Sequence, residues 1–238
     1  MSFPVDARLA ARNQILFALS RQQYPQLFSN LEVVQLPRGK ILFDLAEPIK
    51  KVFFVTSGMV SLLATTRDGS TTKVAMIGDE GLIGVPAVLG ISKAPYQVTV
   101  QIPGRALRVN AEIVIEAFRQ KGPLEDILLR YLHSLISQIS QSAACNRFHT
   151  VEERLCRWLL VSHDRAKSDH LPLTQEALSH MLGAPRTNVT KAATVLKRAG
   201  LIKYQRGDIR ILNRQALEER GCECYRVIAE HIGSFRAA

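Results

Sequence analysis

The chain has 238 residues, of which 47% are hydrophobic, and it carries a formal net charge of +10. That length allows one or two domains with buried cores, and its four cysteines do not form the disulfide framework of a secreted protein. Neither a signal peptide nor an apolar run of about 20 residues stands out, so we expect a cytoplasmic protein without membrane contact.

The first 110 residues change from a helical to a β-like pattern. Apolar residues recur at roughly helical intervals over residues 1–30, which predicts short helices. Turn residues, including Ser57-Gly58 and Pro103-Gly104, separate the β-rich runs that follow. The predicted strands are 31–36, 41–43, 52–56, 59–66, 71–76, 97–101 and 106–109. Such strands are typical of an antiparallel barrel or sandwich, and we interpret the glycine-rich segment 78–84 as a turn because it lacks the P-loop lysine.

A long helix is predicted after Gly122-Pro123. Its apolar residues follow steps of four and three, the period of a coiled-coil seam. The predicted seam residues are Leu128, Leu132, Leu135 and Ile139. Two such helices would form a symmetric dimer, and a core helix within one subunit is the alternative. A second amphipathic helix, over residues 151–163, follows a hinge expected at 146–150.

Residues 174–202 predict a helix-turn-helix, a motif that presents side chains to the major groove of DNA. Thr174 can cap the first helix, Gly183 supplies a left-handed turn, and Pro185 suits the first position of the second helix. The inward face of that second helix is predicted to be Val189, Ala192, Ala193 and Leu196. Its outer face gathers Arg186, Thr187, Asn188, Thr190 and Lys191. An ordinary helical hairpin with a solvated basic face is the alternative.

Two strands, 201–204 and 209–212, are predicted directly after this motif, with a turn at 205–208. A helix-turn-helix followed by such a hairpin is a winged helix. From Gly183 to Arg214 the chain has eight Lys and Arg residues and one acid, a net +7 within 32 residues. This concentration is typical of a surface that contacts DNA phosphates.

The order of these segments, together with LPLTQEALSHMLGAPRTNVTKAATVLKRAGLI at 171–202 and VEERLCRWLL at 151–160, resembles the Crp/Fnr family of bacterial transcription regulators. The resemblance implies an α+β protein with an N-terminal antiparallel β-roll or barrel of the cyclic-nucleotide-binding kind, a long dimerisation helix and a C-terminal winged helix-turn-helix. The corresponding segments are 1–121, 122–149 and 150–238. It also implies a dimeric, sequence-specific DNA-binding regulator, with RNA polymerase as a further candidate partner.

The family reads bases through an Arg-Glu-x-x-x-Arg set, and alignment on Gly183 and Val189 places Arg186, Thr187 and Lys191 at its three positions. The resemblance implies that Arg186 contacts a guanine, whereas Thr187 lacks the family's carboxylate and Lys191 lacks the planar fork of arginine. With Asn188, these three are the predicted base-reading residues. The predicted contacts to the DNA backbone are Thr174, Thr190, Lys203 and Arg206.

Family members that bind cyclic AMP have a Gly-Glu-Leu segment followed by Arg-Ser or Arg-Thr. The matching segments here are Gly84-Val85-Pro86 and 94–99, and neither holds a charged residue. Cyclic AMP is therefore not expected to bind through the usual contacts, and the effector stays unknown. A cyclic-nucleotide-type ligand module whose winged helix contacts protein is the competing function.

The cysteines and histidines do not predict a metal site. No cysteine precedes Cys145, whereas the oxygen-sensing branch of the family holds an iron–sulfur cluster through N-terminal cysteines. Cys222 and Cys224 offer only two thiols, which we interpret as buried or idle, and the histidines lack paired zinc-site spacing. No catalytic constellation stands out, so we do not expect an enzyme.

Overall fold

The computed structural model describes residues 7–236, except residues 20, 70 and 206. The chain divides into two compact units, one containing residues up to 62, 76–135 and those from 235 onward, the other containing residues 63–75 and 136–234. The long helix α6 (Pro123–Phe148) contributes to both units, and its start after Gly122 confirms the predicted helix. Within the described residues, no helix is both long and apolar enough to cross a membrane.

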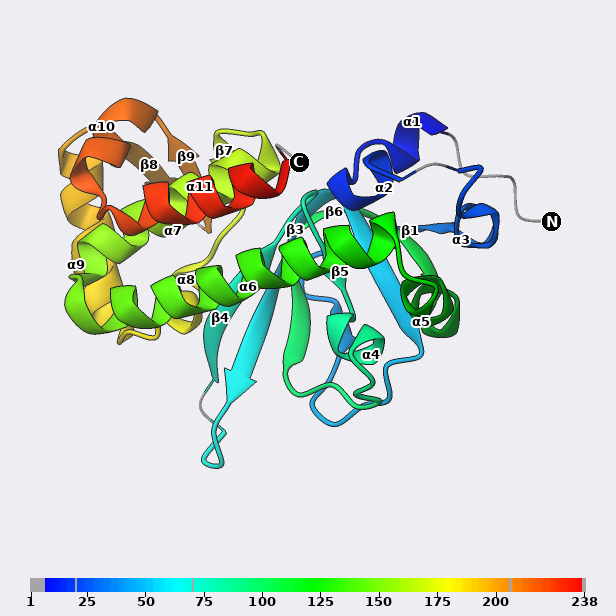
Figure 1. Ribbon diagram of the computed structural model, residues 1–238. Coiled ribbons are helices and arrows are strands. Elements are labelled where there is room, and N and C mark those ends of the chain that lie inside the picture. Colours follow the sequence, from blue (N-terminus) through cyan, green and yellow to red (C-terminus); the bar gives the residue numbers. More distant parts are fainter. Residues whose placement is uncertain (1–6, 20, 70, 206, 237–238) are drawn as a thin grey trace. The chain divides into compact units, whose positions relative to one another are not determined.

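An antiparallel sheet curls into a roll in the N-terminal half of the chain (Figure 1). Its strands are β1 (Glu32–Leu36), β2 (Ile41–Phe43), β3 (Lys51–Thr65), β4 (Thr71–Ile77), β5 (Leu82–Ile83) and β6 (Gln97–Asn110). The order is β1-β6-β3-β4, with β2 beside β6 and β5 beside β3. Because β1 and β4 end this order among the described strands, the sheet is an open roll and not a closed barrel.

Two predicted turns lie inside long strands. β3 continues through Ser57-Gly58 and β6 continues through Pro103-Gly104, so each replaces two of the predicted strands. Gly58 has a φ of +82°, and a Cβ atom on it would lie 2.6 Å from the carbonyl oxygen of Ile102. A Cβ atom on Gly104 would lie 2.0 Å from the carbonyl oxygen of Ser57. These glycines therefore allow neighbouring strands to approach closely, and they do not end the strands.

Short helices accompany the roll: α1 (Ala7–Ala10), α2 (Gln14–Phe17), α3 (Pro25–Ser29), α4 (Val85–Val88) and α5 (Ala111–Arg119). The first three confirm the helices predicted within residues 1–30, whereas α4, α5 and strand β5 were not predicted. The buried Asn13 amide nitrogen donates hydrogen bonds of 2.9 Å to the carbonyl oxygens of Val55 and Gly81. Its amide oxygen also caps α2. Asn13 thus anchors a helix that is too short to be stable alone.

The C-terminal unit is a winged helix, as predicted. Its elements are α7 (Val151–Ala166), β7 (His170–Leu171), α8 (Gln175–Leu182), α9 (Arg186–Arg198), β8 (Ile202–Gln205), β9 (Asp208–Ile211), α10 (Arg214–Arg220) and α11 (Cys224–Arg236). The strand order is β7-β9-β8, and two-residue β7 was not predicted. Between α6 and α7, Thr150 and Glu153 form a reciprocal capping box, which starts α7 within the predicted hinge region.

Candidate nucleic-acid interface

The turn between α8 and α9 is held by hydrogen bonds at both ends. The Thr174 hydroxyl oxygen accepts from the backbone nitrogen of Ala177 at 3.1 Å, which confirms Thr174 as the cap of α8. Gly183 ends α8 with a φ of +55°, as predicted. The buried Arg154 guanidinium donates to the carbonyl oxygen of Leu182 at 2.9 Å, so the last turn of α8 is fixed to α7.

One predicted detail of this turn is wrong. Pro185 is the cap residue before α9 and not its first helical residue, because its ψ of 142° is extended. The helix begins at Arg186, and the backbone nitrogen of Val189 donates to the carbonyl oxygen of Pro185 at 3.2 Å. A proline fits this position because its fixed φ suits the chain just before a helix and its missing N–H would have no helical partner.

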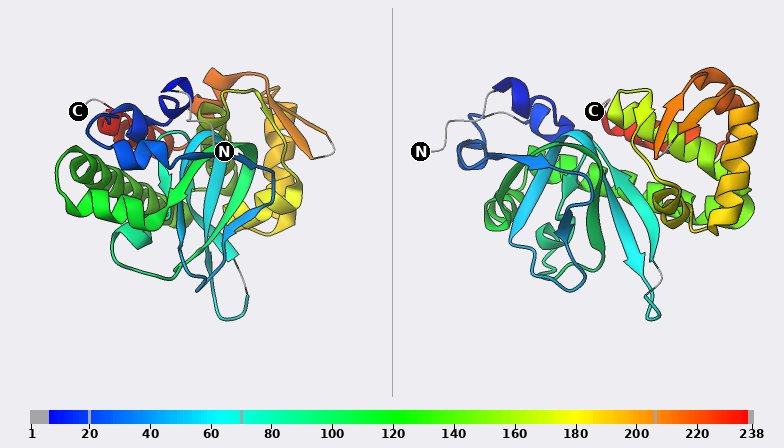
Figure 2. Two further views of the ribbon diagram at one scale, coloured as in Figure 1. Left: turned by 90° about the vertical axis from the view of Figure 1, so that its right-hand side faces the viewer. Right: turned by 180° about the vertical axis from the view of Figure 1, so that it is seen from behind.

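Helix α9 has one buried and one exposed face. The inward residues are buried as predicted: Val189, Ala192, Ala193 and Leu196. On the opposite face, the exposed residues at the N-terminal end are Arg186, Thr187, Asn188 and Lys191. In the right-hand view of Figure 2, α9 (yellow) runs beside the wing strands (orange). The fold therefore presents the predicted base-reading side chains to solvent on a rigid helix.

Arg186 is held by an ion pair across the turn. Its guanidinium donates to the carboxylate of Glu176 in the first turn of α8, and both side chains are 61% exposed. The Thr190 hydroxyl donates to the carbonyl oxygen of Arg186 at 2.8 Å. Thr190 and Thr174 thus already make local backbone hydrogen bonds in the free protein.

The wing adds a row of basic side chains that the sequence did not predict as a group. In the ladder of β7, β9 and β8, Arg210 pairs with His170 on one side and with Lys203 on the other. All three residues are exposed, and partners directly opposite in a ladder share one face of the sheet. Arg206, a predicted backbone contact, lies outside the described residues. Arg210 was missed because its pairing depends on strand register.

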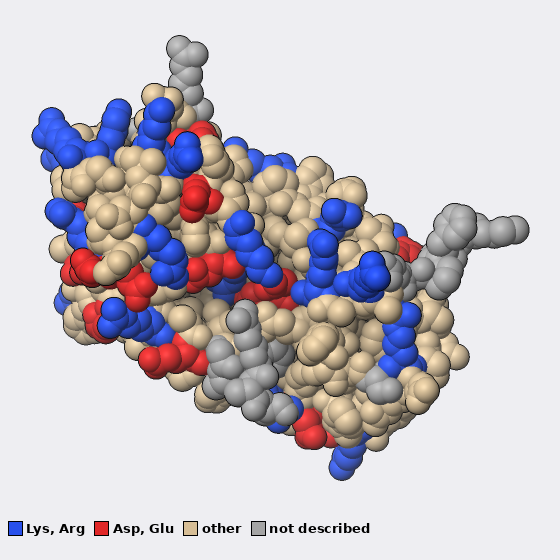
Figure 3. All heavy atoms as spheres, turned by 90° about the horizontal axis from the view of Figure 1, so that it is seen from above, with Lys and Arg blue, Asp and Glu red and all other residues tan. Residues whose placement is uncertain are grey.

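Not every basic residue of this segment belongs to the interface. Arg214 forms ion pairs with Asp164 at 3.0 Å and Glu218 at 3.1 Å, so it connects α7 with α10. Figure 3 shows Lys and Arg side chains (blue) projecting from the edge of the C-terminal unit, and acidic side chains (red) lie between other basic ones on the same unit.

Helix α6 has two apolar stripes. Leu128 and Leu135 of the predicted seam are only 2% and 7% exposed, because they pack against their own chain. Leu132 and Ile139 are half-buried. The exposed apolar residues lie one position after the two buried leucines: Leu129 is 50% exposed and Ile136 is 61% exposed.

The segment that matches the family's phosphate-binding site is apolar and buried. Helix α4 starts after Gly84, whose φ is +101°, and Val85, Pro86, Ala87 and Val88 are all buried. In the second matching segment, Ala94 and Val98 are buried, Pro95 is exposed, and Tyr96, Gln97 and Thr99 are half-buried. Core packing at α4 and uncharged residues at 94–99 therefore stand where cyclic-AMP-binding members have a glutamate and an arginine.

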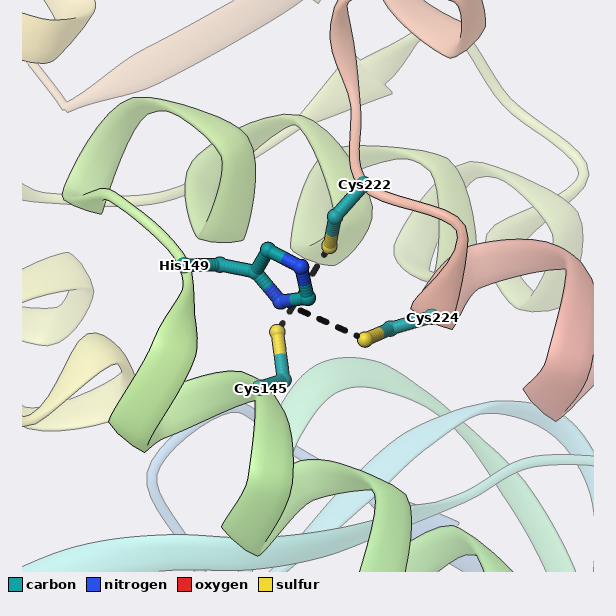
Figure 4. Close-up of side chains that lie close together, drawn as sticks. All are labelled: Cys145, His149, Cys222 and Cys224. Carbon is teal, nitrogen blue, oxygen red and sulfur yellow. Dashed lines mark hydrogen bonds between the residues drawn. The ribbon is translucent and has the colours of Figure 1, made fainter.

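A group of sulfur and nitrogen atoms in the C-terminal unit could hold a metal ion. Cys145 in α6, His149 just after it, and Cys222 and Cys224 at the start of α11 point toward one another (Figure 4). The hydrogen bond with Cys222 lowers the pKa of the Cys145 thiol to about 5, and the nearby charge of Arg157 acts in the same direction. The same hydrogen bond raises the pKa of the Cys222 thiol. The interpretation of Cys222 and Cys224 as idle missed this group, because its members are about 75 positions apart in the sequence.

Comparisons with known protein families agree with both halves of the fold. Residues 33–121 match the cyclic nucleotide-binding domain, and residues 153–220 match the Crp-like helix-turn-helix domain. The global nitrogen regulator of Synechococcus elongatus is 24% identical over 200 residues, which cover 80% of this chain and 90% of the relative. The CRP-like cAMP-activated global transcriptional regulator of Mycobacterium tuberculosis is 22% identical over 227 residues, covering 89% and 98%.

Solved structures share the fold. A putative transcriptional regulator of the crp/fnr family from Eubacterium rectale superposes with a TM-score of 0.70 at 17% identity, covering 90% of this chain and 99% of the other. FixK2 from Bradyrhizobium japonicum gives a TM-score of 0.69 at 17% identity, covering 81% and 98%.

Proposed function

Because this chain belongs to the Crp/Fnr family of transcription regulators, we propose that it binds double-stranded DNA as a dimer, at an operator with two half-sites. The observation that supports this most directly is helix α9, whose polar and basic N-terminal face is exposed while its opposite face is buried. In a dimer, the two copies of α9 would enter successive major grooves on one side of the duplex.

Arg186 is the proposed reader of a guanine, through hydrogen bonds to O6 and N7. It must then leave or share its ion pair with Glu176. An exposed ion pair contributes about 0–1 kcal/mol, whereas a good two-pronged contact to a base contributes about 1–3 kcal/mol. The exchange is therefore favourable. Thr187, Asn188 and Lys191 are proposed to contact the neighbouring bases.

Contacts to the DNA backbone are proposed for Lys203 and Arg210 on the wing and for Thr174 and Thr190 beside α9. Lys203 and Arg210 are cross-strand partners of like charge, an arrangement that is unfavourable in the free protein. A phosphate between them would remove the repulsion. The Thr174 hydroxyl can donate its proton to a phosphate while its oxygen still accepts from the nitrogen of Ala177. The Thr190 hydroxyl must first give up its hydrogen bond to the carbonyl oxygen of Arg186, because it has only one proton to donate.

Dimerisation is proposed along the exposed stripe of α6. Leu129, Leu132, Ile136, Ile139 and Ala143 follow steps of three and four, the spacing of a two-stranded coiled coil. Leu129 and Ile136 replace Leu128 and Leu135 in the seam, because the latter two already pack inside their own chain. Pairing would cover apolar side chains that are otherwise in water.

We propose that cyclic AMP is not the effector, because the charged residues that usually hold it are missing here. The relatives differ on this point by name, since one is called a nitrogen regulator and another cAMP-activated. The buried apolar sequence of α4 provides neither a carboxylate for a ribose hydroxyl nor a guanidinium for a cyclic phosphate. We therefore expect cyclic AMP to change neither the melting temperature nor the affinity for DNA.

The function can be tested by selecting genomic DNA fragments bound by the purified protein, with and without cyclic AMP. Enrichment of a two-fold symmetric motif, with an affinity that falls steeply as salt rises, would support the proposal. Absence of any salt-sensitive duplex binding would refute it and favour a winged helix that contacts protein.

A further inference from the structure

Three cysteines and one histidine converge on one point in the C-terminal unit, among residues that the DNA-binding proposal does not use. The Sγ atoms of Cys145, Cys222 and Cys224 and a ring nitrogen of His149 all lie within 4.8 Å of one another (Figure 4). We propose that these four residues bind a single zinc ion.

The observed separations fit a tetrahedral ion. With Zn–S bonds of about 2.3 Å and Zn–N bonds of about 2.0–2.1 Å, a tetrahedron places two sulfurs about 3.8 Å apart and a sulfur about 3.6 Å from a nitrogen. The Sγ atoms of Cys145 and Cys222 are 3.6 Å apart. The Sγ atom of Cys224 is 3.5 Å from Nδ1 of His149. Only small side-chain movements are needed to surround an ion.

The residues around the four ligands also match a zinc site. While Nδ1 of His149 lies by Cys224, its other ring nitrogen, Nε2, lies 3.3 Å from a carboxylate oxygen of Glu223. A carboxylate at the outer nitrogen is the usual way to orient a zinc-binding histidine. The amide nitrogen of Gln141 donates to Sγ of Cys224 at 3.0 Å, as donors do to zinc-bound thiolates.

The backbone places the ligands in two pairs. Cys145 and His149 are four positions apart, and the backbone nitrogen of His149 donates to the carbonyl oxygen of Cys145 at 3.1 Å, so both side chains leave one face of the last helical turn. Cys222 and Cys224 belong to the segment that starts α11. All three cysteines are less than 9% exposed, which shields the site from water.

Zinc fits this group better than the alternatives. An iron–sulfur cluster contains several irons with bridging sulfides, and ligand atoms within 4.8 Å of one another leave room for one ion only. A disulfide between Cys145 and Cys222 would not account for the contact of Cys224 with His149 or of His149 with Glu223. Zinc with three thiolates has a net charge of −1, and the buried guanidinium of Arg157 acts on Cys145 to offset it.

A bound ion would join parts of the chain that are far apart in sequence. It would connect Cys145 in α6 and His149, the residue before the cap of α7, to the segment that starts α11. Cys145 and Cys222 are 77 positions apart in the sequence. Because the unfolded chain does not hold this arrangement, binding stabilises the folded unit. At free zinc about 1,000-fold above Kd, the melting temperature should rise by on the order of 10 °C.

The test uses the full chain, purified under reducing conditions without added chelator, and needs no DNA. We expect about one zinc per chain by mass spectrometry of the metal content, and visible ligand-field bands of tetrahedral cobalt after replacement by Co²⁺. Cys145→Ser and Cys222→Ser should lose the metal, whereas Cys156→Ser should keep it. Cys156 is also fully buried but is not among the four ligands, so it controls for the loss of a core thiol.

A milder variant covers the case in which cysteine variants do not fold. Glu223→Gln alters an exposed side chain, and we expect zinc affinity about 10–100-fold below wild type, with Glu219→Gln on the neighbouring helix unchanged. The proposal is overturned if wild-type protein contains no zinc and gives no cobalt bands, if it contains iron with sulfide, or if Cys145 and Cys222 are found as a disulfide. It is also overturned if Glu223→Gln and Glu219→Gln bind zinc equally.

Discussion

Replacing Arg186 by alanine tests whether α9 reads DNA sequence. Each two-pronged contact to guanine contributes about 1–3 kcal/mol, and a dimer makes two, so the operator loses about 2–6 kcal/mol. Part of this loss is offset. The wild-type protein must break its exposed ion pair between Arg186 and Glu176 to bind DNA, at about 0–1 kcal/mol per subunit, and the variant has no such pair to break. Even at the low end of the base contact, the loss before this offset is about 30-fold in affinity.

The matched variant is Arg186→Lys, which keeps the positive charge but loses the planar fork. It should retain the salt dependence of binding while losing preference for guanine. Glu176→Gln should strengthen binding of the dimer by up to about 30-fold in the wild-type background, because two ion pairs of about 0–1 kcal/mol no longer have to be broken. It should have less effect beside Arg186→Ala. Fluorescence anisotropy at fixed salt, with the selected operator and with single-base variants of it, measures all of these. If Arg186→Ala weakens every sequence equally, Arg186 contacts the backbone and the reasoning fails.

Three further predictions follow from the fold. Lys203→Ala and Arg210→Ala should each reduce the slope of log affinity against log salt by nearly two units per dimer, at about 0.9 per lost phosphate contact, without changing base preference in titrations at several salt concentrations. Ile136→Glu should yield monomers in light scattering with an unchanged circular dichroism spectrum, because its side chain is 61% exposed on α6. Gly104→Ala should lower the melting temperature sharply or prevent folding, because its Cβ would lie 2.0 Å from a backbone oxygen of β3, whereas Gly69→Asn, where nothing lies within 4 Å, should be tolerated.

The winged helix was predictable because its signals are local. The Thr174 cap, the Gly183 turn and the apolar period of α9 lie within a few residues of one another, and each was found as predicted. The continuous strands through Gly58 and Gly104 were not predictable, because a glycine looks the same whether it turns the chain or admits a neighbouring strand.

Features that depend on contacts between distant parts of the chain could not be predicted from local sequence patterns either. The period of α6 predicted a long helix correctly, but it could not tell which of two apolar stripes faces the helix's own chain. Leu128 and Leu129 satisfy the spacing equally, and only packing distinguishes them. Arg210 joins Lys203 through strand register, and Cys145 meets Cys222 through the tertiary fold. The predicted hairpin 201–212 already implied the first relation, although Arg210 was not identified from it, whereas the second depends on the tertiary fold alone.

The surface chemistry of α9 also separates a DNA partner from a protein partner. Protein interfaces are enriched in aromatic residues and depleted of lysine at their centres. Among the described residues of α9, the exposed face has one large apolar side chain, Val195, which is 37% exposed, and otherwise presents polar and basic groups. The neighbouring wing places Lys203 directly opposite Arg210, which a protein surface could neutralise only with matching carboxylates. Every DNA duplex carries regularly spaced negative phosphates that can neutralise such a pair, so DNA is the partner that these residues fit best.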